Sequence, residues 1–179
     1  MEQVRIHGRG GQGVVTAAEL IAIAAFYEGK HSQAFPNFGV ERSGAPIQSY
    51  ARISDQEIIT HEQIYKPSVL IIQDATLIGH VDVFSGNDKN TIIIINGEKK
   101  NYPNLKLKTK KIFFTPATET ALEIFGKNIV NTIILGAFAK YTKMISLNSL
   151  EQAIKEKFKD KGEEIIKKNI QAIEKIYEK

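Results

Sequence analysis

The feature that most constrains the fold is a glycine-rich turn between a short strand and an apolar helix. Residues 3–7 (QVRIH) alternate between apolar and polar side chains, and the turn 8–13 (GRGGQG) follows at once. The segment 14–28 is apolar nearly all round, which predicts a buried helix that ends near Gly29. Glycines at 8, 10 and 13 match the G-x-G-x-x-G pattern in its required strand-to-helix context. The sequence therefore predicts a Rossmann-like start of an α/β fold.

The rest of the chain continues the alternation of strands and helices. Further strands are predicted at 31–35, 47–53, 57–60, 69–73, 91–95 and 112–115. The turn-like residues 54–56 predict that 47–53 and 57–60 form a hairpin, so the sheet should be mixed. Helices are predicted at 116–125, 128–143, 147–159 and 163–178. We expect one domain over 1–179, a three-layer α/β/α sandwich with a mixed, mostly parallel sheet and a helical C-terminus.

Composition excludes several kinds of site. The 179 residues contain 0 Cys, so this chain alone holds no disulfide, no thiol nucleophile and no zinc or iron–sulfur cluster with cysteine ligands. The longest mainly apolar stretch, 14–27, is shorter than the ~20 residues of a membrane-spanning helix and contains Glu19. The N-terminus lacks the basic region of a secretory signal. We therefore expect a cytoplasmic protein without membrane contact.

Charge is distributed unevenly along the chain. Residues 1–98 carry 7 Lys and Arg against 11 Asp and Glu, whereas residues 99–179 carry 17 Lys against 9 Asp and Glu. The excess begins in the lysine-rich segment 99–111, which could meet an acidic protein such as ferredoxin, a phosphorylated ligand or a nucleic acid. A solvated loop is the simpler interpretation. The segment lacks the arginines and stacking aromatics of single-strand binders, so no nucleic-acid partner is expected.

The glycine-rich turn has two interpretations. The start of the following helix offers unpaired N–H groups that suit an anion, and Arg9 would add a charge. Alternatively, the glycines only allow close packing of helix on strand. A dinucleotide fold would need an acidic residue after the second strand, where Gln33, Ala34 and Phe35 stand instead. A P-loop would need Lys-Ser or Lys-Thr after the last glycine. Asp74, which follows a buried strand, is either a site residue or the cap of the next turn, and we favour the cap.

The loop 36–46 (PNFGVERSGAP) is the second candidate. Phe38, Glu41 and Arg42 on a stiff loop, next to Phe35, have the composition of an interface anchor. An ordinary crossover whose phenylalanines cover the core is the alternative. Both glycine-rich segments are expected at the edge of the sheet where sites form in α/β proteins.

Three segments together resemble one family. IHGRGGQGVVTAAELIA, QAFPNFGVERSGAPIQSYARIS and NTIILGAFAKYTK are similar to the gamma subunits of 2-oxoacid:ferredoxin oxidoreductases, with a likeness over about residues 3–155. Gly44, Ala45 and Pro46 resemble the pyruvate branch more than those for 2-oxoglutarate, 2-oxoisovalerate or indolepyruvate. Val40 and Ser43 depart from the usual family residues.

The resemblance implies a reaction to which this chain contributes without a catalytic or metal-binding residue of its own. Pyruvate, coenzyme A (CoA) and oxidised ferredoxin would give acetyl-CoA, carbon dioxide and reduced ferredoxin, reversibly. Alpha, beta and delta subunits would supply thiamine diphosphate, Mg²⁺ and [4Fe–4S] clusters. The chain would frame the CoA site or an interface with residues Gly8, Arg9, Gly10, Gly11, Gln12, Gly13, Glu41 and Arg42. The alternative from another class is a stand-alone nucleotide-binding protein.

Overall fold

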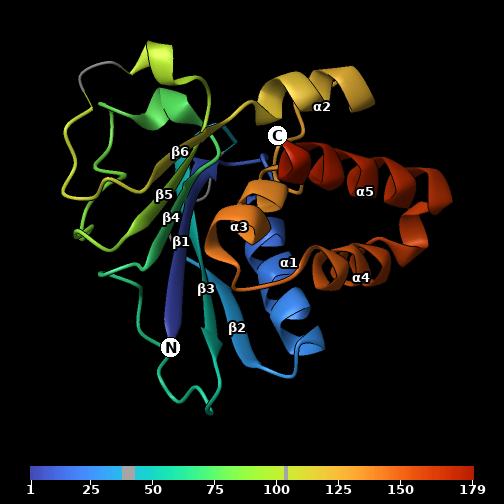
Figure 1. Cartoon of the computed structure of the whole chain (residues 1–179), viewed down its shortest axis with the longest axis horizontal. Helices are drawn as coiled ribbons and strands as arrows, with labels where there is room; N and C mark the ends of the chain where they lie inside the picture. Colours follow the sequence, from blue (N-terminus) through green and yellow to red (C-terminus); the bar gives the residue numbers. More distant parts are fainter. Residues whose placement is uncertain (38–42, 103–104) are drawn as a thin grey trace.

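The computed structural model describes residues 1–37, 43–102 and 105–179, which form a mixed six-stranded sheet in the order β2-β3-β1-β4-β5-β6 (Figure 1). Strands β1, β4, β5 and β6 are parallel neighbours, and β3 runs antiparallel to both β1 and β2. The predicted mixed, mostly parallel sheet is therefore confirmed. The strands are β1 (Glu2–Arg9), β2 (His31–Pro36), β3 (Pro46–Ser54), β4 (Val69–Ile72), β5 (Ile92–Asn96) and β6 (Ile112–Thr115).

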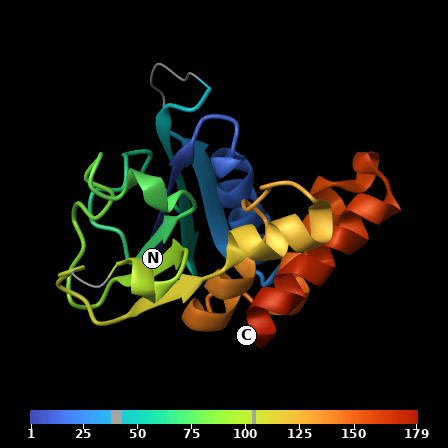
Figure 2. The same ribbon diagram turned by 90° about the horizontal axis from the view of Figure 1, so that it is seen from above.

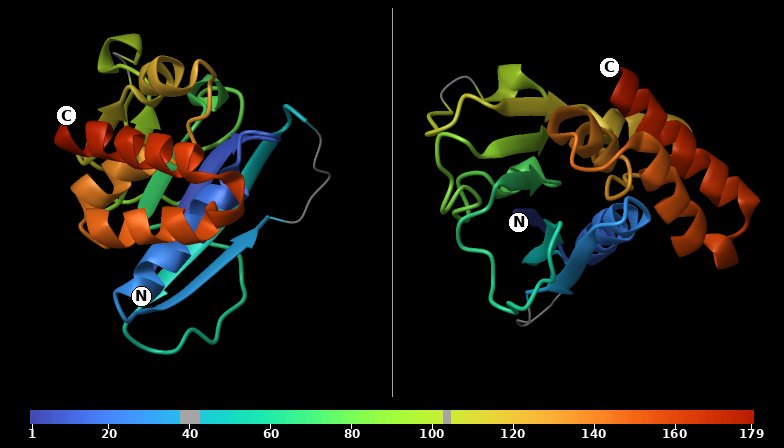
Figure 3. Two further views of the ribbon diagram at one scale, coloured as in Figure 1. Left: turned by 90° about the vertical axis from the view of Figure 1, so that its right-hand side faces the viewer. Right: turned by 60° about the horizontal axis from the view of Figure 1, so that its bottom comes forward.

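Helical segments cover both faces of the sheet and complete the predicted layers (Figure 2). One face carries α1 (Val14–Tyr27), α2 (Ala117–Phe125), α3 (Ile134–Thr142), α4 (Leu147–Lys157) and α5 (Glu163–Glu178). Figure 3 shows α4 and α5 as an outer pair over α1 and α3. The other face is covered by the short 3₁₀ helices η1 (Ala75–Leu77) and η2 (Lys99–Asn101) and by long connections. A third 3₁₀ helix, η3 (Lys159–Lys161), joins α4 to α5.

The central strands are buried on both faces, which explains their unbroken apolar runs. In β4, Val69 and Ile71 join the large core beneath the α-helices, whereas Leu70 and Ile72 join a smaller core on the opposite face. The smaller core also contains Leu77, Val83, Ile93 and Ile95, with Leu105 and Leu107 packed against it. The connections on that face are thus held by apolar side chains.

The predicted hairpin between 47–53 and 57–60 is wrong. The segment 57–60 forms no strand, because both edges of β3 are already occupied by β1 and β2. The guanidinium of the buried Arg52 instead fixes the segment after 57–60, because it donates hydrogen bonds to the carbonyl oxygens of Thr60 and Glu62.

Two helix boundaries illustrate how far local signals reach. α2 ends at Gly126 as predicted, in the left-handed conformation (φ 65°) that glycine adopts without strain. The predicted helix over 128–143 begins later, at Ile134, because 131–133 form a turn. Among the described residues, none of the helices combines the length and the hydropathy of a membrane-spanning segment.

Candidate functional site

The glycine-rich turn lies against the base of the loop 36–46, as predicted for two segments at one edge of the sheet. The Gly10 N–H donates to the carbonyl oxygen of Ala45 (2.9 Å), and the Gly44 N–H donates to that of Gly10 (3.0 Å). Gly10 and Ser43 also form an isolated parallel β-bridge, just beyond the antiparallel pairing of β1 with β3. Two predicted site residues of this loop, Glu41 and Arg42, lie outside the described residues.

The glycines of the turn serve backbone conformation and close packing. Gly11 and Gly13 have backbone φ angles of 90° and 69°, which residues with a Cβ atom rarely adopt. A Cβ atom on Gly13 would also lie 2.4 Å from Nδ2 of Asn131. A Cβ atom on Gly8 would lie 2.6 Å from Cγ2 of Val14, so this glycine makes room for the start of α1. Close packing of helix on strand therefore accounts for these positions.

Arg9 and Gln12 turn inward, and both reach Asp74 at the end of β4. The Arg9 Nε donates to Asp74 Oδ2 (3.2 Å), and the Gln12 Nε2 donates to the same oxygen (2.8 Å). Arg9 also donates to Thr76 Oγ1 (2.9 Å) and to the carbonyl oxygen of Gly44 (3.0 Å). The guanidinium predicted to meet an anion is thus held by groups of this chain.

Asp74 caps η1, as the sequence predicted. Its Oδ1 accepts the backbone N–H of Thr76 (3.0 Å). Burial opposes ionisation of this carboxyl, but hydrogen bonds from Thr76 and Gln12 and the charge of Arg9 outweigh it and hold the pKa of Asp74 below its ordinary value. The carboxylate therefore stays charged at neutral pH and ties the glycine-rich turn to β4.

A polar cleft of about 260 Å³ opens beside this cluster, at the carboxyl ends of β4 and β5. Asn96, which ends β5, holds one wall: its Oδ1 accepts the N–H of Thr118 (3.1 Å) and its Nδ2 donates to the carbonyl oxygen of Gln73 (2.9 Å). The carboxyl edge of parallel strands is where α/β proteins form sites. The cleft is lined by Gln12, Gln73, Asp74, Ala75, Thr76, Asn96, Tyr102, Thr118, Asn128 and Val130.

Gln73 is the lining residue with an unmet hydrogen-bonding demand. It is 1% exposed, and among the described residues neither Oε1 nor Nε2 of its carboxamide has a hydrogen-bond partner. Burying an unpaired amide costs stability unless something satisfies it. Gln73 and Asn96 were not predicted from the sequence. Gln73 follows one apolar parallel strand and Asn96 ends the next, which is the signal that indicated Asp74.

The start of α1 adds a polar feature to the same edge. Its N-cap is Gly13, and no described side chain caps it. The N–H groups of a first helical turn carry partial positive charge and suit an anion. The described residues contain no group of three or more His, Asp or Glu side chains placed to hold a metal ion. The arrangement can bind and position a polar ligand or a partner chain.

Comparison with known proteins gives the family. The family model described as "Pyruvate ferredoxin/flavodoxin oxidoreductase" matches residues 3–179. The chain is 51% identical over 156 residues to pyruvate synthase subunit PorC of Methanosarcina barkeri, covering 87% of this chain and 85% of the relative. It is 48% identical over 182 residues to the pyruvate/ketoisovalerate oxidoreductases common subunit gamma of Pyrococcus furiosus, covering 100% of this chain and 97% of the relative.

Solved structures agree with this result. The crystal structure of pyruvate oxidoreductase subunit PORC from Thermotoga maritima matches with a TM-score of 0.85 and 31% identity, over 99% of this chain and 96% of that one. A 2-oxoglutarate:ferredoxin oxidoreductase chain from Magnetococcus marinus shares the fold at 21% identity with a TM-score of 0.74, over 97% of this chain and 30% of that one. With the match spanning almost every residue, this chain belongs to the pyruvate ferredoxin/flavodoxin oxidoreductase family.

Proposed function

We propose that this chain is the gamma subunit of a pyruvate:ferredoxin oxidoreductase, active only within the assembled complex. The observation that carries the proposal is the similarity to subunits named pyruvate synthase subunit PorC. This similarity extends over nearly the whole chain, at 51% identity in one relative and 46% in another. The complex converts pyruvate, CoA and oxidised ferredoxin into acetyl-CoA, carbon dioxide and reduced ferredoxin.

The chemistry of bond cleavage and electron transfer belongs to partner chains in this proposal. Iron–sulfur clusters are held by cysteine thiolates, and this chain has 0 Cys. Thiamine diphosphate would accept the electron pair released when the oxoacid loses carbon dioxide, and alpha, beta and delta subunits would carry it, its Mg²⁺ and the clusters. In this proposal the gamma subunit binds and positions CoA or a neighbouring subunit, and it transfers no electrons.

The edge formed by the glycine-rich turn is the part of the chain that we assign to this role. The turn, the uncapped start of α1 and the base of the loop 36–46 meet there, beside the polar cleft. CoA is anionic and carries amides, so backbone N–H groups and neutral carboxamides suit it. Because Arg9 is held by Asp74, we assign direct contact with an anionic group to the backbone of the turn and to Arg42.

A purely structural role for this edge, as a seat for a neighbouring subunit, is the rival proposal. The reconstituted complex carrying Arg42→Ala separates the two. We expect a raised KM for CoA, an unchanged KM for pyruvate and normal assembly by native mass spectrometry. Lys155 is an exposed lysine of α4, and Lys155→Ala is the matched control. Loss of assembly with an unchanged KM for CoA would establish the rival.

A second candidate function rests on relatives that are named as subunits common to two oxidoreductases. The gamma subunit of P. furiosus is named as common to pyruvate and ketoisovalerate oxidoreductases, and it covers all of this chain at 48% identity. A chain of this kind would assemble with two sets of catalytic subunits. Affinity purification of the tagged chain from its own cells tests this: one set of partners with pyruvate activity supports the first proposal, whereas two sets, with activity on pyruvate and on 2-ketoisovalerate, support the second.

A further inference from the structure

A group of lysines lies on the side of the sheet that faces away from the α-helices. Four come from the connection that leads into β6, one from the turn before β5 and one from the segment before β4 (Figures 1 and 2). All six are exposed. We call them the basic surface: Lys66, Lys89, Lys106, Lys108, Lys110 and Lys111.

The core fixes where these lysines stand. Leu105 and Leu107 pack against the smaller hydrophobic core, and Thr109 is 3% exposed. The residues between them therefore alternate outward, as in any extended segment with one buried side. The segment 105–109 is thus attached to the sheet at every second residue, which places its lysines on the surface.

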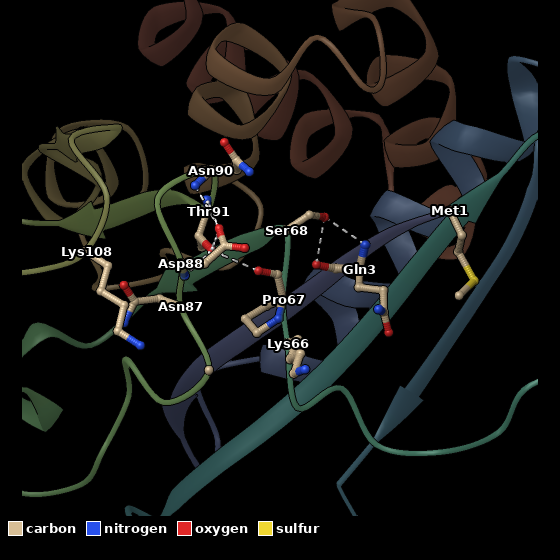
Figure 4. Close-up of a pocket in the computed structure, with 11 residues that line it drawn as sticks. Met1, Gln3, Lys66, Pro67, Ser68, Asn87, Asp88, Asn90, Thr91 and Lys108 are labelled. Carbon is tan, nitrogen blue, oxygen red and sulfur yellow. Dashed lines mark hydrogen bonds between the residues drawn. The ribbon is translucent and has the colours of Figure 1, made fainter.

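A cavity of about 530 Å³ hollows this surface between Lys66 and Lys108 (Figure 4). Figure 4 shows Lys108 beside Asn87 and Lys66 below Pro67. Asp88, also in the lining, already accepts the backbone N–H groups of Asn90 (2.7 Å) and Thr91 (3.1 Å). Two lysines thus flank a recess of a size that admits a carboxylate side chain of another protein.

Unpaired charge distinguishes the basic surface from other lysines of this chain. Lys157, Lys168 and Lys175 each have a carboxylate within 4 Å. Within the described ranges, none of the six lysines of the basic surface has such a partner. Their field therefore extends into solvent and attracts negative charge over about a Debye length, ~8 Å at physiological salt.

The residue types indicate a transient protein partner. Lysine is depleted in the cores of stable interfaces, where aromatic residues and arginine are enriched. The basic surface contains no arginine, the side chain best suited to bidentate phosphate contacts of nucleic acids. Strongly hydrated lysine charges instead speed the encounter of oppositely charged proteins.

We propose that the basic surface is a transient docking surface for an acidic protein, the electron acceptor of the assembled complex. The proposal rests on the proposed function, because only the assembled complex delivers electrons to a protein acceptor. An acidic side chain of the acceptor enters the recess between Lys66 and Lys108, and the other lysines orient its negative face. The surface steers the acceptor, while the electrons leave through partner chains.

The test reverses three of these charges in the assembled complex. The variant Lys106→Glu/Lys108→Glu/Lys110→Glu is compared with Lys155→Glu/Lys159→Glu/Lys161→Glu, which makes the same charge change at exposed positions in α4 and η3. Pyruvate oxidation is measured with ferredoxin and with methyl viologen. We expect kcat/KM for ferredoxin to fall about tenfold or more at low ionic strength in the first variant alone, and to recover toward wild type at high salt.

The controls separate this proposal from the function on which it rests. Unchanged methyl viologen activity in both variants shows that the complex is intact, and failure of wild type to oxidise pyruvate with either acceptor would overturn the proposed function itself. An unaltered ferredoxin rate in the first variant would overturn the docking surface. Failure of the first variant to assemble would also overturn it, because the surface would then be a permanent subunit interface. Salt-sensitive binding of wild type to random DNA, lost in the first variant, would overturn it in favour of a nucleic-acid site.

Discussion

Arg9 and Asp74 form an ion pair, with Nε and Oδ2 3.2 Å apart, that joins the end of β1 to the second residue after β4. The pair lies 65 positions apart in sequence and is largely sheltered, with 31% and 14% of the two side chains exposed. Gln12 donates to the same carboxylate oxygen. The glycine-rich turn is therefore held from the neighbouring strand as well as by its own backbone.

Asp74→Asn is expected to destabilise the chain by about 1–2 kcal/mol. The amide retains one acceptor oxygen but loses the charge that Arg9 faces, and hydrogen bonds to charged groups contribute ~1.5–3 kcal/mol when sheltered. Urea denaturation of the isolated chain measures the effect. Asp55→Asn, in the exposed turn after β3, is the matched control and should change stability by less than about 0.5 kcal/mol. Equal effects of the two variants would show that the ion pair contributes nothing.

A buried histidine predicts how stability varies with pH. His7 is 2% exposed and accepts a hydrogen bond from Nε of Arg5 (3.0 Å). Burial and then the neighbouring Arg5 charge lower the pKa of His7 to about 3. The folded state therefore stays unprotonated between pH 6.5 and 3, whereas the unfolded chain takes up a proton below about pH 6.5. Stability must fall as the pH drops through this window.

The expected loss between pH 7.5 and pH 5 is about 2 kcal/mol from this group, since each pH unit below the unfolded pKa costs ~1.36 kcal/mol. The measurement is urea unfolding of wild type and His7→Gln at both pH values. The glutamine retains an acceptor for Arg5 but takes up no proton. The His7→Gln variant should therefore lose about 2 kcal/mol less stability than wild type between these pH values. The depressed pKa of Asp74 adds nothing here, because its contribution is lost only below about pH 4. Parallel pH profiles for the two proteins would contradict the assignment.

The sequence predicted the order of most strands and helices because each has a local signal. Residues 92–95 of β5 are all β-branched isoleucines, and Glu163–Glu178 is a charged amphipathic helix found with its predicted bounds. The segment 57–60 also has strand-like residues, but Ile59 is 82% exposed, because the place beside β3 is taken by β2. Competition between segments for one sheet edge is not visible in any local window.

The site was predicted by position more than by chemistry. The turn 8–13 and the flank 43–45 meet as expected. The inward orientation of Arg9 was not predictable, since Asp74 and Thr76 come from another strand connection. Likewise Arg5 and Arg52, at 5% and 1% exposed, are buried in strands whose alternation suggested a solvent-facing side. Carbonyl oxygens of irregular segments satisfy them, which only the tertiary structure shows.

The crossing of α3 and α5 depends on Gly136. A Cβ atom there would lie 2.3 Å from the carbonyl oxygen of Ile173, a backbone atom that cannot move alone. Gly136→Ala should destabilise the chain by about 1–3 kcal/mol despite the better helix propensity of alanine. Gly126→Ala is the control: it has open space but a φ of 65°, so it should cost about 1 kcal/mol. Thermal unfolding of both variants shows which one destabilises the chain more. A smaller loss of stability for Gly136→Ala than for Gly126→Ala would show that α3 and α5 move apart without cost.

The unpartnered carboxamide of Gln73 leads to a prediction with opposite signs in the free chain and in the complex. Gln73→Met replaces it with an apolar side chain of similar length and should stabilise the isolated chain by about 1 kcal/mol, because an unpaired amide no longer has to be desolvated. If a ligand or neighbouring subunit satisfies this amide, the same variant should raise the KM for CoA or weaken assembly. Thr142→Val, which replaces a hydroxyl already bonded to Phe138, is the matched control and should destabilise the free chain without affecting either readout. A Gln73→Met chain that is less stable on its own would show instead that the carboxamide is already satisfied, by bound water, before the complex forms.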